Sequence, residues 1–121
     1  MKEKESVFKV NGKEYKAVFN LNVMQEIQIE YGTFKKWGDL TDGKKEDEES
    51  EVDIKALIFG IKAMINEAID IDNEVREEKE PLLTDKQVGR LITEMGLIEA
   101  TKQLNETVID STKDDNDSKN E

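Results

Sequence analysis

The chain has 121 residues, a length that suits one domain with a modest core. Apolar residues make up 36% of it and charged residues 39%, so we expect part of the chain to be solvated. Residues 1–45 carry nine lysines against seven acidic residues, residues 46–121 carry nine basic against 22 acidic residues, and the net charge is −11. This acidic surplus argues against nucleic acid and anionic membranes as partners, because both are bound by clustered Lys and Arg.

Two residue types that carry much of protein chemistry, histidine and cysteine, are missing from the chain. Without them there is no thiolate, no disulfide, no common neutral-pH general base and no usual ligand set for zinc, iron or copper. We therefore predict that the protein is not an enzyme and has no catalytic residue, no cofactor and no metal. The charged start at residues 1–6 and the short apolar runs also argue against a signal peptide and a membrane span.

One acidic stretch has the opening spacing of a calcium-binding loop. Asp70, Asp72 and Glu74 occupy its first, third and fifth positions. Val75 stands where such a loop needs a glycine, and Pro81 stands where it needs a bidentate glutamate. The motif fails at two determining positions, and we interpret the stretch as a solvated helix end.

Residues 7–19 predict a β-hairpin. Asn11-Gly12 is a strong signal for a two-residue turn, because a type I′ turn needs positive φ at both positions. This turn would place Lys9 opposite Glu14 and would gather the apolar side chains on one face. The residues of that face are Phe8, Val10, Tyr15, Ala17 and Phe19. A lone hairpin is marginally stable in water, so the helices that follow are expected to cover it.

Five helices are expected after the hairpin, because apolar residues recur at helical spacing behind capping residues. Their predicted positions are 21–31, 34–38, 54–69, the stretch between Thr84 and Gly96, and 97–111. The charged stretches 41–51 and 70–80 are predicted to be connections, and 112–121 a disordered acidic tail. The predicted fold is mainly α with a small N-terminal β-hairpin (α+β), as one compact domain over residues 1–111.

The apolar stripes of these helices are expected to face the core, and Leu21, Ile54 and Leu97 are counted among them. Gly60 and Gly89 lie inside predicted helices, where glycine costs roughly 1 kcal/mol relative to alanine. We interpret them either as tolerated or as points where another backbone approaches closely.

Five apolar residues are candidates for contact with a partner. Trp37 is either a cover over the hairpin or an interface anchor, since tryptophan is enriched at binding hot spots. Phe59 and Ala63 lie outside the main stripe of the 54–69 helix, and Ile98 and Ile109 lie outside that of the last helix. Each of the five also fits the core of the domain, and that alternative stays open.

Three segments, in this order, resemble a known protein family. They are VFNLNVMQEIQIEYGTFKKWGDL at 18–40, DIKALIFGIKAMINEAI at 53–69 and PLLTDKQVGRLITEMGLIEATKQLNETV at 81–108. Together with the hairpin they resemble the tail assembly chaperones of long-tailed phages (siphophages) and prophages of Gram-positive bacteria. The similarity spans about residues 7–110.

This resemblance implies a function and a set of partners. Such chaperones bind the long, apolar, helical tape measure protein, keep it soluble, and help subunits of the tail tube protein polymerise around it. They act in the host cytoplasm and are absent from the finished virion. Many are made in two lengths by a translational frameshift, and this chain would correspond to the short form. Self-association through the same apolar faces is a further expectation.

Two other classes of protein fit the composition. A small helical structural protein of a phage, such as a head–tail connector or completion protein, would remain in the virion. An acidic inhibitor that mimics nucleic acid would need carboxylates spaced like phosphates on a rigid face. The densest acidic stretches here fall in predicted connections and in the tail, which counts against mimicry.

Overall fold

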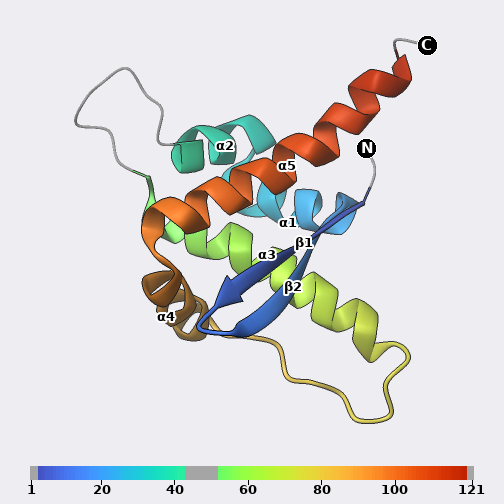
Figure 1. Ribbon diagram of the computed structural model, residues 1–121. Helices are drawn as coiled ribbons and strands as arrows, with labels where there is room; N and C mark the ends of the chain where they lie inside the picture. The colour runs from blue at the N-terminus through green and yellow to red at the C-terminus, as the bar shows by residue number, and fades with distance from the viewer. Residues whose placement is uncertain (1–2, 43–51, 120–121) are drawn as a thin grey trace.

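The computed structural model describes residues 3–42 and 52–119, with side chains described as far as Ser111. An N-terminal hairpin is followed by five helices, which confirms the predicted fold class (Figure 1). The elements are β1 (Lys4–Val10), β2 (Lys13–Phe19), α1 (Leu21–Tyr31), α2 (Phe34–Asp42), α3 (Ile54–Asn73), α4 (Asp85–Met95) and α5 (Leu97–Lys119).

The hairpin has the predicted turn and register. Asn11 and Gly12 have φ angles of 51° and 80°, as a type I′ turn requires. Phe8 pairs with Tyr15 across the two strands, and the Phe8 side chain is fully buried. The opposite face is partly covered as well, because Val18 is only 1% exposed.

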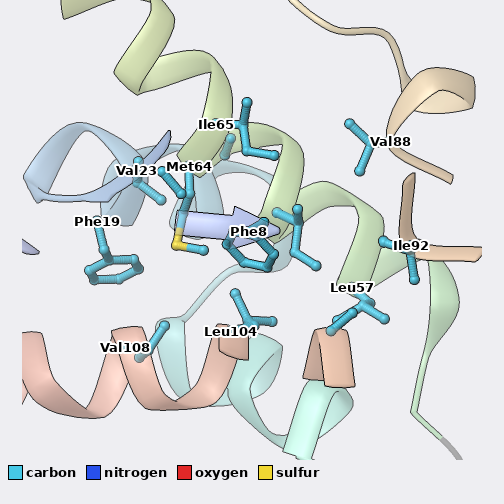
Figure 2. Packing of buried hydrophobic residues seen from close by; sticks show 14 of the residues in the cluster. Phe8, Phe19, Val23, Leu57, Met64, Ile65, Val88, Ile92, Leu104 and Val108 are labelled. Atoms are coloured by element: carbon cyan, nitrogen blue, oxygen red, sulfur yellow. The ribbon is translucent and has the colours of Figure 1, made fainter. Parts of the chain in front are cut away.

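One hydrophobic core joins the hairpin to all five helices. In the close view of Figure 2, side chains from both strands and from α1, α3, α4 and α5 converge on one cluster. The labelled residues are Phe8, Phe19, Val23, Leu57, Met64, Ile65, Val88, Ile92, Leu104 and Val108. Helix α3 runs through the middle of the domain and packs against β2, α1, α2, α4 and α5. Removal of this apolar area from water is the main term that stabilises the fold.

Helix α2 is longer than the predicted stretch 34–38. It continues to Asp42 and includes Thr41, which is fully buried. The Thr41 hydroxyl lies 3.2 Å from the carbonyl oxygens of Trp37 and Gly38, which satisfies its hydrogen-bonding capacity inside the helix. The predicted connection 41–51 is therefore wrong at its first two residues, and residues 43–51 lie outside the described part of the chain.

Helix α3 is also longer than predicted and continues to Asn73. Two asparagines seven residues apart on α3 hold the returning chain by paired side-chain hydrogen bonds. The Asn66 amide bonds the backbone N–H and C=O of Leu83 at 2.8 and 3.1 Å. The Asn73 amide bonds the N–H and C=O of Glu80 at 2.9 and 3.0 Å. These contacts place the segment before α4 against α3.

The predicted helix starts are confirmed by their caps. Asn20 and Asp53 accept backbone hydrogen bonds at the starts of α1 and α3, and Thr84 opens α4 with a full capping box. The last helix was expected to end near residue 111, but the backbone of α5 is helical through Lys119. The disordered tail at 112–121 stays a prediction, because its side chains and last two residues lie outside the description.

Candidate functional site

Trp37 belongs to the core. Its side chain is 1% exposed, and its indole N–H donates a 3.0 Å hydrogen bond to the carbonyl oxygen of Ala56. A Cβ atom at Gly60 would lie 2.4 Å from Trp37 Cζ2, so glycine is needed for the indole to reach α3. Of the two interpretations of Gly60, tolerance or close approach of another backbone, neither describes what is found, because the group that approaches closely is the Trp37 side chain. These contacts replace the interface-anchor interpretation of Trp37 with the core interpretation.

The prediction that Ala63 contacts a partner is also wrong, because Ala63 lies in the core. It is 5% exposed and is part of the central cluster. Helix α3 is covered on two sides, so residues outside its main apolar stripe are buried as well, including the fully buried Ala56. A residue in this position can reach no partner unless the domain opens.

Phe59 lies at an uncovered part of α3. Its ring is half-buried and packs edge-on against the ring of Tyr31, with 5.5 Å between the centroids. Ile54 and Ile58 lie on the same side of the helix, and Ile54 is 51% exposed. The three side chains line a hollow of about 520 Å³ between α1 and α4, which we call the α3 groove.

Four charged residues line the α3 groove, and they form two ion pairs. Lys55 Nζ lies 3.8 Å from Glu30 Oε2 on α1, and Lys62 Nζ lies 2.7 Å from Asp85 Oδ1 at the start of α4. Such surface pairs contribute roughly 0–1 kcal/mol each to stability. Their effect on the groove is that its lining has no net charge, although the protein carries −11.

Ile98 and Ile109 lie on the outer side of α5. Their side chains are 86% and 57% exposed. Lys102 and Asn105 fall between them at helical spacing, so the four residues form one line on the helix surface, which we call the α5 stripe. A shallow hollow of about 440 Å³ runs beside the stripe and extends to Val52.

Sequence reasoning missed two of the exposed apolar residues at these faces. Ile54 and Leu97 were assigned to the core, and they are 51% and 45% exposed. Leu21, also assigned to the core, is 66% exposed. Each is the first residue of its helix, where the neighbouring elements no longer cover the side chain. The first position of a helix is therefore a signal of exposure that helical periodicity alone does not give.

The failed calcium motif is partly helical. Asp70 and Asp72 lie in the last turns of α3, where residues two apart point about 200° away from each other. Asp72 instead forms an ion pair with Lys16 of β2 at 3.5 Å. Among the side chains that the structure describes, in residues 3–42 and 52–111, no three acidic groups lie together to hold a metal ion. In the same part of the chain, no helix is both long enough and apolar enough to cross a membrane.

A third hollow lies between the tip of the hairpin and α4. Its volume is about 550 Å³, and charges of both signs line it, with Lys13 and Arg90 among Glu14, Glu80 and Glu94. This mixed lining indicates solvated surface more than a site selective for one ligand class. Comparison of the chain with protein-family models, with curated proteins and with solved structures found no match.

Proposed function

We propose that this protein is a non-enzymatic chaperone that holds an apolar helical segment of a partner protein in the α3 groove. The observation that carries the proposal is a hollow lined by Ile54, Ile58 and Phe59 whose charged lining residues are already paired with one another. Its partners are the tape measure protein and the tail tube protein, as the resemblance to tail assembly chaperones implies.

The chemistry of the groove favours an uncharged occupant. An apolar helix would cover Ile54 and Phe59 and gain from removing their surface from water. It would leave no buried charge unpaired, because each lysine of the groove already has a carboxylate partner. Helix-in-groove binding uses residues at i, i+3, i+4 and i+7, so a long helical client offers many equivalent segments.

The acidic surface supports the same role. A net charge of −11 keeps a protein soluble and opposes non-specific association. A complex that adds an apolar helix to such a surface would carry that charge with it. We expect the protein to act in the cytoplasm of the bacterial host and to be missing from purified virions.

Co-expression with the tape measure protein of the same phage or prophage tests the proposal. We expect the tape measure protein to stay in the soluble fraction and to elute as a complex with the chaperone. Ile54→Asp should abolish this, because it places a charge in the groove without harming the helix start, where an acidic residue is favourable.

Leu21→Asp is the matched control for that variant. Leu21 is also an exposed first residue behind an asparagine or aspartate cap, but it lies outside the α3 groove. The Leu21→Asp variant should still keep the tape measure protein soluble. An insoluble tape measure protein beside the wild-type chain would refute the proposed function, and equal behaviour of the two variants would refute the groove as the site.

A further inference from the structure

One asparagine of this chain stands directly before a glycine. The chain has eight asparagines, and the other seven precede leucine, valine, glutamate or aspartate. Each of those following residues carries a side chain next to its backbone nitrogen, which hinders attack by that nitrogen on the asparagine before it. Asn11 is followed by Gly12, which has no Cβ atom, so the backbone nitrogen beside its side chain is the least hindered of the eight.

The surroundings of Asn11 leave its side-chain amide open to reaction. Asn11 and Gly12 are both exposed at the tip of the hairpin. The Asn11 amide makes no hydrogen bond to another described residue, whereas the amides of Asn66 and Asn73 are held by backbone groups. A Cβ atom placed on Gly12 would meet nothing within 4 Å, so no other part of the described chain crowds its backbone. The Gly12 nitrogen can therefore reach Asn11 Cγ without displacing a packed group.

We propose that Asn11 is a site of spontaneous deamidation in the folded protein. The Gly12 backbone nitrogen attacks Asn11 Cγ, so that the new N–Cγ bond forms and the Cγ–Nδ2 bond breaks. The side-chain nitrogen leaves as ammonia, with the proton of the Gly12 N–H. Water then adds to either carbonyl carbon of the succinimide ring and breaks the bond from that carbon to the ring nitrogen. Opening at Cγ gives aspartate, and opening at the main-chain carbonyl gives isoaspartate, with water as the co-reactant in both cases.

The two products should affect the hairpin differently. Aspartate can stay in the turn, because Asp-Gly suits a type I′ turn as Asn-Gly does. Isoaspartate carries the main chain through Cγ and lengthens it by a methylene group. The longer path no longer fits the two-residue turn that places Val10 opposite Lys13. Phe8 and Val10 are buried only in that register, so isoaspartate should loosen the hairpin from the helices.

The closed turn should slow the reaction without preventing it. Ring closure requires rotation within Asn11, whose backbone the turn holds at a φ of 51°. The tip can open locally while the core stays folded, because its residues are exposed. We therefore expect deamidation in the folded protein, at a rate several-fold below that of the urea-unfolded chain. The inference is independent of the proposed function, since the tip of the hairpin does not line the α3 groove.

Ageing of the purified chain at mildly alkaline pH and physiological temperature tests the inference. Peptide mapping by mass spectrometry should find aspartate and isoaspartate at position 11, with isoaspartate identified by its enzymatic methylation. Asn22 is exposed but followed by valine, and it should stay unchanged in the same samples. The aged protein should unfold at a lower urea midpoint than the fresh protein.

Asn11→Gly is the matched variant. Gly-Gly also suits a type I′ turn, so the hairpin is kept while the reacting amide is removed. The urea midpoint of this variant should not fall on ageing, and an equal fall would overturn the assignment to Asn11. An Asn11 that stays intact in the folded protein, or that gives aspartate without isoaspartate, would overturn the site or its succinimide route. Aged chains that contain isoaspartate but unfold at the original midpoint would overturn its effect on the hairpin.

Discussion

The α3 groove and the α5 stripe both expose isoleucine to solvent, but they differ in how their charges are satisfied. In the groove, Lys55 and Lys62 are paired with carboxylates of neighbouring helices in the same chain. On the stripe, Lys102 and Glu106 are exposed and join none of the ion pairs found in the described part of the chain. An apolar face whose charges are already paired with each other suits a partner without charges.

The shapes of the two faces support the same division. The groove is a hollow between α1 and α4, and our proposal places one face of a single partner helix over it. The stripe instead lies on the exposed side of α5, the helix that Figure 1 shows crossing in front of α1 and α3, and its end residues Ile98 and Ile109 are 86% and 57% exposed.

The largest expected effect comes from the core that both faces share. Trp37→Ala would remove the buried indole and its hydrogen bond to Ala56, and should lower the free energy of unfolding by about 3–5 kcal/mol. Because this side chain braces α3, the α3 groove should lose client binding as well. Urea unfolding measures the change. Trp37→Phe should cost less, and equal stability of Trp37→Ala and the wild type would contradict the core assignment.

A smaller effect should separate the two faces. The Asn66 amide holds Leu83, just before the Thr84 cap and Asp85, so it positions the α4 wall of the groove. Asn66→Ala should cost about 1–2 kcal/mol of stability and weaken client binding, while leaving the exposed face of α5 unchanged.

Asn73→Ala is the matched control for Asn66→Ala. Asn73 makes the same pair of backbone contacts with Glu80, but at an exposed site farther from the groove. The Asn73→Ala variant should weaken client binding less than Asn66→Ala does, as measured by co-purification. An equal loss of client binding in Asn66→Ala and Asn73→Ala would contradict a role of Asn66 in positioning the α4 wall.

Local signals in the sequence were enough to predict the hairpin and the helix starts. The Asn11-Gly12 turn determines its own register, and the caps at Asn20, Asp53 and Thr84 bond within three residues of themselves. Such features depend on near neighbours alone. This is why the order and type of every element were predictable from the residues.

Features that depend on distant parts of the chain were not predictable. The burial of Trp37 depends on the missing side chain of Gly60, which is 23 positions away. The extension of α2 depends on the burial of Thr41, and the exposure of Leu97 depends on where its neighbours end. Helical periodicity specifies which side of a helix a residue occupies, but it does not specify whether another element lies there. The candidate contact residues were consequently a mixture of core and surface positions.

The smallest expected effect concerns the charge balance near the groove. Burial, then the nearby Glu67, raises the pKa of Glu26 above its ordinary value of 4.5, while Lys62 of the groove lowers it. A carboxyl whose folded-state pKa is raised contributes stability below its unfolded pKa and loses that contribution as the pH rises through the folded value. Glu26→Gln should therefore stabilise the protein at pH 7, by at most about 0.5 kcal/mol because solvent screens this site.

The pH dependence of stability distinguishes an effect of the raised Glu26 pKa from a simple change in packing. The stability difference between Glu26→Gln and the wild type should shrink as the pH falls through the ordinary value of 4.5 and vanish at about pH 3, where the glutamate is neutral in both the folded and the unfolded chain. Urea unfolding midpoints of both proteins, measured from pH 3 to pH 8, would report this stability difference. A wild type more stable than Glu26→Gln at pH 7 would mean that Lys62 outweighs burial. In that case Lys62 would be shared between Glu26 and Asp85, and the neutral lining of the α3 groove would have to be reconsidered.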